Sequence, residues 1–234
     1  MKLLKINLES NQNWIDELRS KDFDAKKIFK DLSCYLMKSD GELDVFDTVR
    51  MMDENFMQSD FTVFLSHSHD DLEDGKKIAT ILEERGEKVF IDSLYWNHFE
   101  SLLKQIDDQY SKNQNDNSYD YQKRNITTAV VHTLLFISLQ KAIYKCDKFI
   151  FLDSKSVDKI KVSDRKSTTS PWIFLELEII NMIIQINSSN IFKRGFYNKD
   201  IAFNFDIKKL LENFNDIKTK EQLLLNIVGK ENER

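Results

Sequence analysis

Cysteine is scarce in this chain of 234 residues, which holds only Cys34 and Cys146. The two lie far apart in segments with helical patterning, so the sequence supports neither a disulfide framework nor a zinc site. We expect both side chains to be buried thiols in a reducing cytosol.

Long apolar runs are also absent. No segment contains the roughly 18 uninterrupted apolar residues that a membrane-spanning helix requires, and the N-terminus has no signal-peptide core. These absences predict a cytoplasmic protein with no membrane partner.

Positive charge is not in excess, and phosphate-binding loops are missing. The chain has 34 Lys and Arg against 39 Asp and Glu, a formal net charge of −5, whereas nucleic-acid binding requires clustered Lys and Arg. Nucleic acid is therefore not an expected partner. Neither a G-x-G-x-x-G nor a Walker A sequence occurs, which disfavours dinucleotide binding by a glycine-rich loop.

What the chain does contain is a set of short, strongly apolar segments. Hydrophobic residues make up 41% of the chain and include 17 Phe, enough for a sizeable core. Residues 61–66, 89–91 and 148–152 are rich in β-branched and aromatic side chains, so each is expected to be a buried strand, with the first at the centre of the sheet. An amphipathic helix between the first two ends at Gly86. This order predicts a parallel sheet with right-handed crossovers.

The first 59 residues have a different pattern. Apolar residues recur at helical spacing from Trp14 through Leu36, and again from Val45 to Met52. We therefore expect two or three helices that form an N-terminal region distinct from the sheet. Simple packing on the next domain and a partner-binding face are both open as roles for this region.

The segments that follow the second and third strands are less regular. The residues after Asp92 are expected to be a loop that enters a helix, and the polar residues 112–124 a surface insertion. Residues 126–146 are expected to form a long, well-buried helix. Near the C-terminus, residues 201–205 are expected to be a last edge strand.

Polar residues follow the first strand directly and form one wall of the expected site. Ser66 to Asp71 lie where the carboxyl end of a strand passes to a helix N-terminus, the usual ligand position in open α/β sheets. His67 and His69 point the same way on an extended segment, but no third metal ligand is identifiable. Polar lining of the strand end is therefore preferred over a metal site.

A second wall is expected at the helix that begins with Ser170 and Pro171, a capping residue followed by a residue suited to the first turn. Trp172 and Glu176 share one face of this helix because they are four residues apart. The neighbours of Glu176 are largely apolar, and a carboxylate among such residues is costly to bury unless it is paired or functional. A structural and a functional role both remain open for it.

These segments together resemble the Toll/interleukin-1 receptor (TIR) domain family, especially its bacterial members. The first conserved box of the family is similar to VFLSHSHDD, its second strand to GEKVFID, and its third segment to KFIFLD followed by SPWIFLEL, in which a Trp precedes a catalytic Glu by four positions. The resemblance covers residues 60–186. It implies an α/β fold with a flavodoxin-like parallel sheet flanked by helices, and it divides the chain into an N-terminal helical appendage, residues 1–59, and a TIR-like α/β domain, residues 60–234.

The resemblance also implies a reaction. Catalytic members of the family cleave the nicotinamide–ribose bond of NAD, as NAD glycohydrolases or ADP-ribosyl cyclases, and Glu176 is by carry-over the catalytic carboxylate. The substrate-binding residues implied in the same way are Ser66, His67, Ser68, His69, Asp92, Tyr95, Trp96 and Trp172. NAD is then the substrate, with no further cofactor and no metal. One carboxylate suffices, because the reaction passes through an oxocarbenium-like state and the cationic leaving group needs no proton.

A role in bacterial anti-phage defence signalling follows from the same resemblance. The implied partners are further copies of the chain, through TIR surfaces, or another protein of a defence system. Two alternatives remain open: a TIR interaction module that only scaffolds, and an enzyme like the nucleoside deoxyribosyltransferases, which share this kind of fold and also use a Glu.

Overall fold

The computed structural model of the chain describes residues 1–23, 32–38, 44–52, 54, 60–113, 118–157, 166–188 and 205–228. The chain divides into two compact units. The first consists of residues 1–21, 61–92 and 143–234, and the second of residues 22–60 and 93–142.

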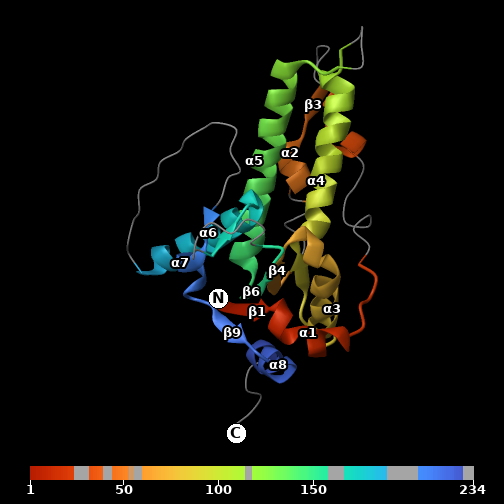
Figure 1. Ribbon diagram of the computed structural model, residues 1–234. Coiled ribbons are helices and arrows are strands. Elements are labelled where there is room, and N and C mark those ends of the chain that lie inside the picture. The colour runs from red at the N-terminus through yellow and green to blue at the C-terminus, as the bar shows by residue number, and fades with distance from the viewer. Residues whose placement is uncertain are drawn as a thin grey trace. The chain divides into compact units, whose positions relative to one another are not determined.

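The first unit is built on a sheet of five strands in the order β5-β4-β6-β1-β9, and every pair of neighbours is parallel (Figure 1). This confirms the expected α/β fold, a flavodoxin-like parallel sheet flanked by helices. The strands are β1 (Lys2–Asn7), β4 (Val63–Ser66), β5 (Val89–Ile91), β6 (Lys148–Asp153) and β9 (Asn215–Ile217). The first predicted strand, β4, lies between β5 and β6 rather than at the middle of the sheet, where β6 lies.

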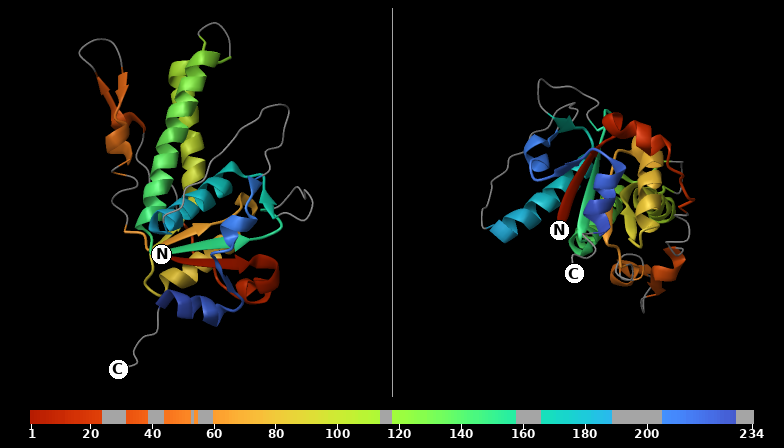
Figure 2. Two further views of the ribbon diagram at one scale, coloured as in Figure 1. Left: turned by 90° about the vertical axis from the view of Figure 1, so that its left-hand side faces the viewer. Right: turned by 90° about the horizontal axis from the view of Figure 1, so that it is seen from below.

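Helices cover both faces of this sheet. Helix α6 lies on one side of it, and α1, α3 and α8 lie on the other (Figure 2). Their bounds are Leu8–Asp16 for α1, Leu72–Glu83 for α3, Pro171–Ser188 for α6 and Lys220–Val228 for α8. The short helix α7 (Lys208–Leu211) follows β8 (Phe205–Asp206), which pairs antiparallel with β7 (Ser167–Thr168). The expected edge strand near residue 205 therefore belongs to this small second sheet, and residues 201–204 lie outside the described part of the chain.

The N-terminal strand overturns the expected domain boundary. Residues 2–7 form β1, which pairs with β6 on one side and with β9 on the other, so the start of the chain is an integral part of the main sheet. Leu4 and Ile6 are completely buried there. Two lysines made this run look unlike an interior strand, but Lys5 ends in an ion pair with Asp216 at 3.1 Å, and long lysine stems allow such a strand to be buried while the amino groups reach polar partners.

The strand order explains how the fold accommodates β1. In the flavodoxin-like order 2-1-3-4-5, a connection reverses direction between the first and third strands. Strands β5, β4 and β6 follow the 2-1-3 part of that order, and the N-terminal strand β1 fills the fourth place. The reversal point therefore lies between β4 and β6.

Aromatic rings connect neighbouring strands in the core. Phe64 of β4 stacks on Phe90 of β5 and on Phe149 of β6, with ring centroids 5.0 and 5.2 Å apart. Phe214, just before β9, meets Phe149 edge-on at 5.9 Å. Such pairs contribute about 0.5–1.5 kcal/mol each beyond the area that they bury, so they help to fix the register of the strands.

The second unit contains two groups of elements. The first group is the 3-10 turn η2 (Leu32–Tyr35), the antiparallel hairpin of β2 (Leu36–Lys38) and β3 (Asp44–Phe46), and helix α2 (Thr48–Met52). The hairpin contradicts the helical expectation for this region, because Tyr35 and Phe46 pack edge-on across it at 6.2 Å instead of sharing a helix face. Cys34 is exposed, so the prediction of a buried thiol was wrong for Cys34 and is confirmed for Cys146.

The second group is a pair of long helices that lie side by side in Figures 1 and 2. Helix α4 (Asp92–Ile106) continues into the π-helical turn η5 (Asp107–Ser111), and α5 spans Tyr121–Lys145. The buried carboxylate of Asp107 accepts hydrogen bonds from Arg124 at 3.2 Å and from Thr127 at 2.5 Å, which joins the two helices near the turn. The expected loop after Asp92 is thus helical, and the expected insertion already belongs to α5 from Tyr121 onward.

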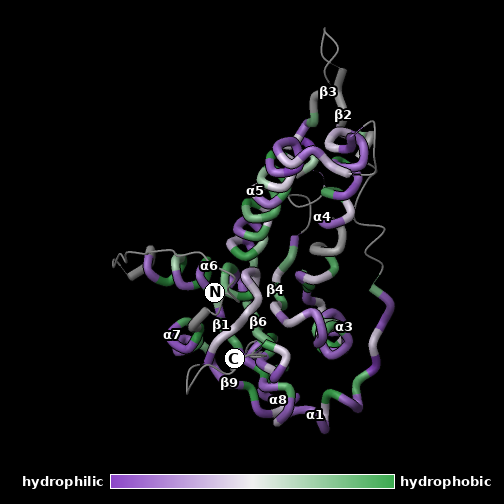
Figure 3. Tube along the Cα trace, turned by 45° about the horizontal axis from the view of Figure 1, so that its top comes forward, coloured by the Kyte–Doolittle hydropathy of each residue, from purple (hydrophilic) through white to green (hydrophobic). Residues whose placement is uncertain are grey.

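Helix α5 is apolar along much of its length (Figure 3). Among the described residues it is the one helix whose length and composition would let it cross a membrane, a test that the core helix of a soluble protein also passes. Val131, Leu134, Leu135 and Leu139 are buried, whereas Ile126 and Val130 are exposed. The helix is therefore less buried than its sequence suggests.

Candidate functional site

The candidate site lies at the carboxyl edge of the parallel sheet, at the reversal point of the strand order. Ser66 is the last residue of β4 and stands in register with Phe151 of β6, and Asp92 follows β5 directly. Connections leave β4 and β6 in opposite directions at this point, which opens the sheet edge to side chains from elsewhere in the chain. Glu176 of α6 provides one such side chain.

The start of α6 determines where Glu176 lies. Ser170 Oγ accepts a hydrogen bond from the backbone N–H of Ile173 at 3.3 Å, which confirms the predicted cap. From this start, Ile173, Glu176, Leu177 and Ile180 fall on one buried face of the helix, at spacings of three, one and three residues. Glu176 is thus the carboxyl group on the face that packs in the interior, and it is completely buried.

Ser66 holds one oxygen of this carboxyl group. Its hydroxyl donates a hydrogen bond to Glu176 Oε2 at 2.6 Å, and both side chains are completely buried. The other oxygen, Oε1, accepts no hydrogen bond from any donor among the described residues. Burial raises the pKa of Glu176 well above its ordinary value, and the charge of Asp92 and a hydrogen bond with Asp92 raise it further, against the opposing effect of Ser66. Burial and the neighbouring charge of Asp92 therefore both favour the protonated form of Glu176.

His67 also contacts Asp92. Its Nδ1 lies 2.9 Å from the carbonyl oxygen of Ser68, and its Nε2 lies 3.4 Å from Asp92 Oδ1. The imidazole packs on α3 at Gly75, where a Cβ would come within 2.9 Å of the ring. Ser66, His67, Asp92 and Glu176 therefore form one buried polar cluster, which we call the Glu176 cluster.

The remaining residues of the first wall have other surroundings. Ser68 is buried and its hydroxyl lies 3.5 Å from the carbonyl oxygen of Ser156, whereas His69 is exposed in the short turn η4 (His69–Asp71). Asp71 accepts a hydrogen bond from Ser154 at 2.6 Å, and partial burial raises its pKa. His69 is thus not part of the buried cluster. Asp71, the last residue of the expected first wall, contacts Ser154, which sequence reasoning missed.

The three aromatic candidates, Tyr95, Trp96 and Trp172, are not described to the same extent. Trp172 lies one turn before Glu176 on α6 and is half-buried, as their spacing predicted. The backbone of Tyr95 and Trp96 belongs to α4, in the second unit, and the placement of their side chains lies outside the described part of the structure. The structure therefore joins Ser66, His67, Asp92 and Glu176.

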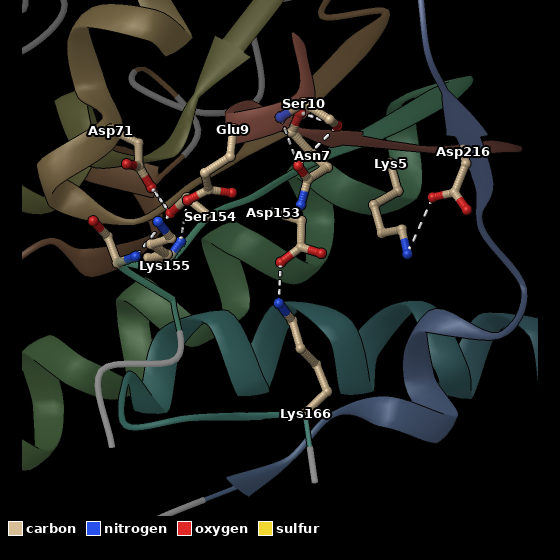
Figure 4. Close-up of polar contacts among 11 residues, drawn as sticks. Lys5, Asn7, Glu9, Ser10, Asp71, Asp153, Ser154, Lys155, Lys166 and Asp216 are labelled. Atoms are coloured by element: carbon tan, nitrogen blue, oxygen red, sulfur yellow. Dashed lines mark hydrogen bonds and ion pairs between the residues drawn. The ribbon is translucent and has the colours of Figure 1, made fainter. Parts of the chain in front are cut away.

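A second polar group lines the same sheet edge beside β6 and β1 (Figure 4). Asp153 forms an ion pair with Lys166 at 2.5 Å, Asn7 caps α1 by accepting from the backbone N–H of Ser10, and Glu9 accepts from the backbone N–H of Lys155 at 2.8 Å. These contacts connect loops to the ends of strands. Within the described ranges, no three His, Cys, Asp or Glu side chains are placed to hold a metal ion.

Comparisons of the chain with protein-family models, with curated proteins and with solved structures found no match. A functional assignment therefore depends on the geometry of the Glu176 cluster and on the resemblance of the motifs that form it.

Proposed function

We propose that the chain is a TIR-type enzyme that cleaves the nicotinamide–ribose bond of NAD, with Glu176 as the catalytic residue. One observation carries the proposal: the Glu of the W-x-x-x-E pattern is a buried carboxyl group, held by Ser66 at the reversal point of a parallel sheet. Carboxyl groups with strongly shifted pKa values in such positions are typical of active sites. A structural role alone would favour an apolar residue at this place, because burying a carboxyl group is costly.

The chemistry requires the ionised form of Glu176. The bond between the ribose carbon and the nicotinamide nitrogen breaks with its electron pair going to nicotinamide, which leaves as a neutral base, and positive charge develops on the ribose. A carboxylate stabilises this oxocarbenium-like state by attraction and by accepting hydrogen bonds from ribose hydroxyls. Water then adds to the ribose carbon and releases a proton, which gives ADP-ribose; an acceptor within the molecule gives a cyclic product.

Activation is part of the proposal, because a completely buried Glu176 cannot contact NAD. A rearrangement that exposes it has to precede catalysis, and we propose that self-association of the chain, or binding of a defence-system partner, drives this step in the bacterial cytoplasm. An equilibrium that differs by a few kcal/mol between the two forms changes the active population by two to three decades. Such control suits an anti-phage function, since a cell cannot tolerate continuous NAD loss.

The test measures nicotinamide release from NAD by the purified chain over a wide range of protein concentration, with and without a crowding agent, and with the chain fused to an oligomerising tag. Specific activity is expected to rise with concentration. Glu176→Gln is expected to lower it on the order of a hundredfold or more, because the charge is lost while the volume is kept. The matched control is Glu178→Gln, a half-buried carboxylate on the same helix.

Three outcomes would contradict the proposal. Wild-type rates in Glu176→Gln would remove Glu176 from the reaction. Absence of turnover in every assembly state would favour the scaffold alternative. Turnover of deoxynucleosides but not of NAD in parallel incubations would favour the deoxyribosyltransferase-like alternative.

A further inference from the structure

Helix α5 has two apolar faces, and only one of them is buried. The first face, which includes Val131, Leu134 and Leu135, is buried in the interior. The second face is formed by residues at spacings of three and four, which places them on one side of the helix. We call this second face the α5 stripe, and it consists of Ile126, Ala129, Val130, Thr133 and Ile137.

The α5 stripe is accessible in the structure. Ile126 and Val130 are 65% and 43% exposed, Ala129 and Thr133 are also exposed, and Ile137 is half-buried. The hydroxyl of Thr133 donates a hydrogen bond to the carbonyl oxygen of Ala129 at 2.8 Å, so its polar atom has a partner within the helix. The stripe therefore offers a partner apolar surface that is not interrupted by a polar group in need of water.

The composition of α5 is suited to contact with a bilayer. A helix that is apolar on all sides is normally covered on all sides, by protein or by lipid. Among the described helices α5 alone has the length and composition to cross a membrane, yet only 39% of its most apolar stretch is buried. Its first face is packed in the protein, so crossing a membrane would mean unpacking the core. Contact with a surface that lies along the helix requires no such change.

The charges on α5 restrict what can cover the stripe. The helix contains no Asp or Glu, and Lys123 and Lys141 border the stripe near its two ends, on the same side because they lie about five turns apart. Arg124 forms an ion pair with Asp107 at 3.2 Å, and Asp120 accepts a hydrogen bond from the backbone N–H of Lys123 at the helix start. The positive charge beside the stripe suits a negatively charged partner.

A second copy of the chain suits this surface less well. If two α5 helices packed in parallel through their stripes, each lysine would lie beside its own equivalent. In an antiparallel pair centred on the stripe, Lys123 would lie opposite Lys141 of the other copy. Like charges placed together across an interface are unfavourable, whereas anionic lipid headgroups attract the same lysines.

We propose that the α5 stripe docks on an anionic lipid surface, with the helix lying along it. The apolar side chains of the stripe enter the boundary between headgroups and acyl chains, and Lys123 and Lys141 lie at the level of the phosphates. Each lysine strengthens such binding roughly fivefold. The inference is independent of the proposed NAD reaction. It differs from the expectation of no membrane partner, which considered only helices that span a membrane.

The test is sedimentation of the full chain with vesicles of phosphatidylcholine alone and of phosphatidylcholine with an equal part of phosphatidylglycerol. The wild type is expected to bind the anionic vesicles more tightly, and less so at high salt. Ile126→Gln is expected to weaken this binding roughly tenfold by loss of apolar burial, and Lys123→Gln roughly fivefold. The matched controls are Leu225→Gln and Lys218→Gln, at exposed positions of the other unit, and they are expected to bind as the wild type does.

Thr133→Leu provides a gain that misfolding cannot imitate. It adds apolar area at an exposed position of the stripe, so it is expected to strengthen binding to the anionic vesicles several-fold. Unchanged binding by Thr133→Leu would overturn the proposal, and so would a wild type that binds no vesicle. Analytical ultracentrifugation in which Ile126→Gln dissociates a dimer, with vesicle binding as in the wild type, would instead make the stripe an interface between copies of the chain.

The two proposals fail in different ways. Vesicle binding that depends on Ile126, in a chain that never cleaves NAD, would leave the docking surface standing and remove the proposed function. NAD cleavage that depends on Glu176, in a chain that binds no vesicle, would leave the function standing and remove the docking surface.

Discussion

The pH dependence of stability offers a direct measure of the buried carboxyl group at the centre of the site. Glu176→Gln keeps the shape of the side chain, its amide can still accept from Ser66, and it no longer titrates. In the unfolded chain a Glu ionises near pH 4.3 or so, whereas burial raises the pKa of Glu176 well above that value in the folded chain. Between the two values the folded state holds one more proton than the unfolded state.

The sign of the effect follows from this difference in bound protons. Wild-type stability due to Glu176 is complete below the unfolded pKa and is lost as pH rises toward the folded pKa, at about 1.4 kcal/mol for each pH unit. The slope belongs to the Glu176–Asp92 pair, because the two carboxyl groups titrate together. Glu176→Gln should therefore gain stability relative to wild type as pH rises from about 4 toward neutrality.

The assay is urea denaturation of the wild type and of Glu176→Gln at half-unit pH steps, with Glu178→Gln as the control. The free energies of unfolding of wild type and Glu176→Gln should diverge above about pH 4 with the slope given above, whereas the control should follow the wild type. A constant difference across pH would refute the reasoning, because it would mean that Glu176 titrates alike in the folded and unfolded chain.

Three further predictions follow from individual positions. Leu4→Ala is expected to cost about 2–5 kcal/mol of unfolding free energy in denaturant titrations, because Leu4 is completely buried in β1; a cost below about 1 kcal/mol would contradict its place in the main sheet. Gly86→Ala is expected to cost about 1 kcal/mol by the same assay, because its φ of 85° lies in the left-handed region although the space around it is open, and an unchanged stability would contradict this backbone conformation. A maleimide reagent at pH 7 is expected to modify Cys34 and to spare Cys146, which is buried and whose pKa is raised to about 12 by burial; mass spectrometry of the native chain that finds both modified would contradict this placement.

Much of the fold was predictable because three of its strands, β4, β5 and β6, are short and almost entirely apolar segments. The segments that became β4, β5 and β6 have few charged residues, and strands buried on both faces require such composition. Strand β1 was not predictable in the same way, because two of its six residues are lysines and its apolar partners come from β6 and β9, far along the chain. No local pattern reports a pairing between residues more than two hundred positions apart.

The sequence identified residues of the candidate site but did not determine what each of them does. The pattern of Trp172 and Glu176 on one helix face and the polar run after β4 pointed to Ser66, His67 and Glu176, whereas Asp92 was named only through the family resemblance. Their contacts depend on distances that a sequence does not contain, such as the 3.4 Å between His67 Nε2 and Asp92 Oδ1. Gly75 carries no signal of its own, and only the packed structure shows that its missing side chain makes room for the imidazole.

Burial and ionisation of Glu176 are linked, and this link is consistent with the proposed enzyme being switched on by a rearrangement. A protonated carboxyl group is tolerated in the interior at modest cost, whereas an ionised one is not unless it is paired. Any rearrangement that admits water and substrate to Glu176 also lowers the cost of ionising it, so exposure and deprotonation favour each other. In the proposed enzyme, the form with Glu176 buried therefore keeps the candidate catalytic group inaccessible and favours its uncharged state, and one conformational step removes both restraints.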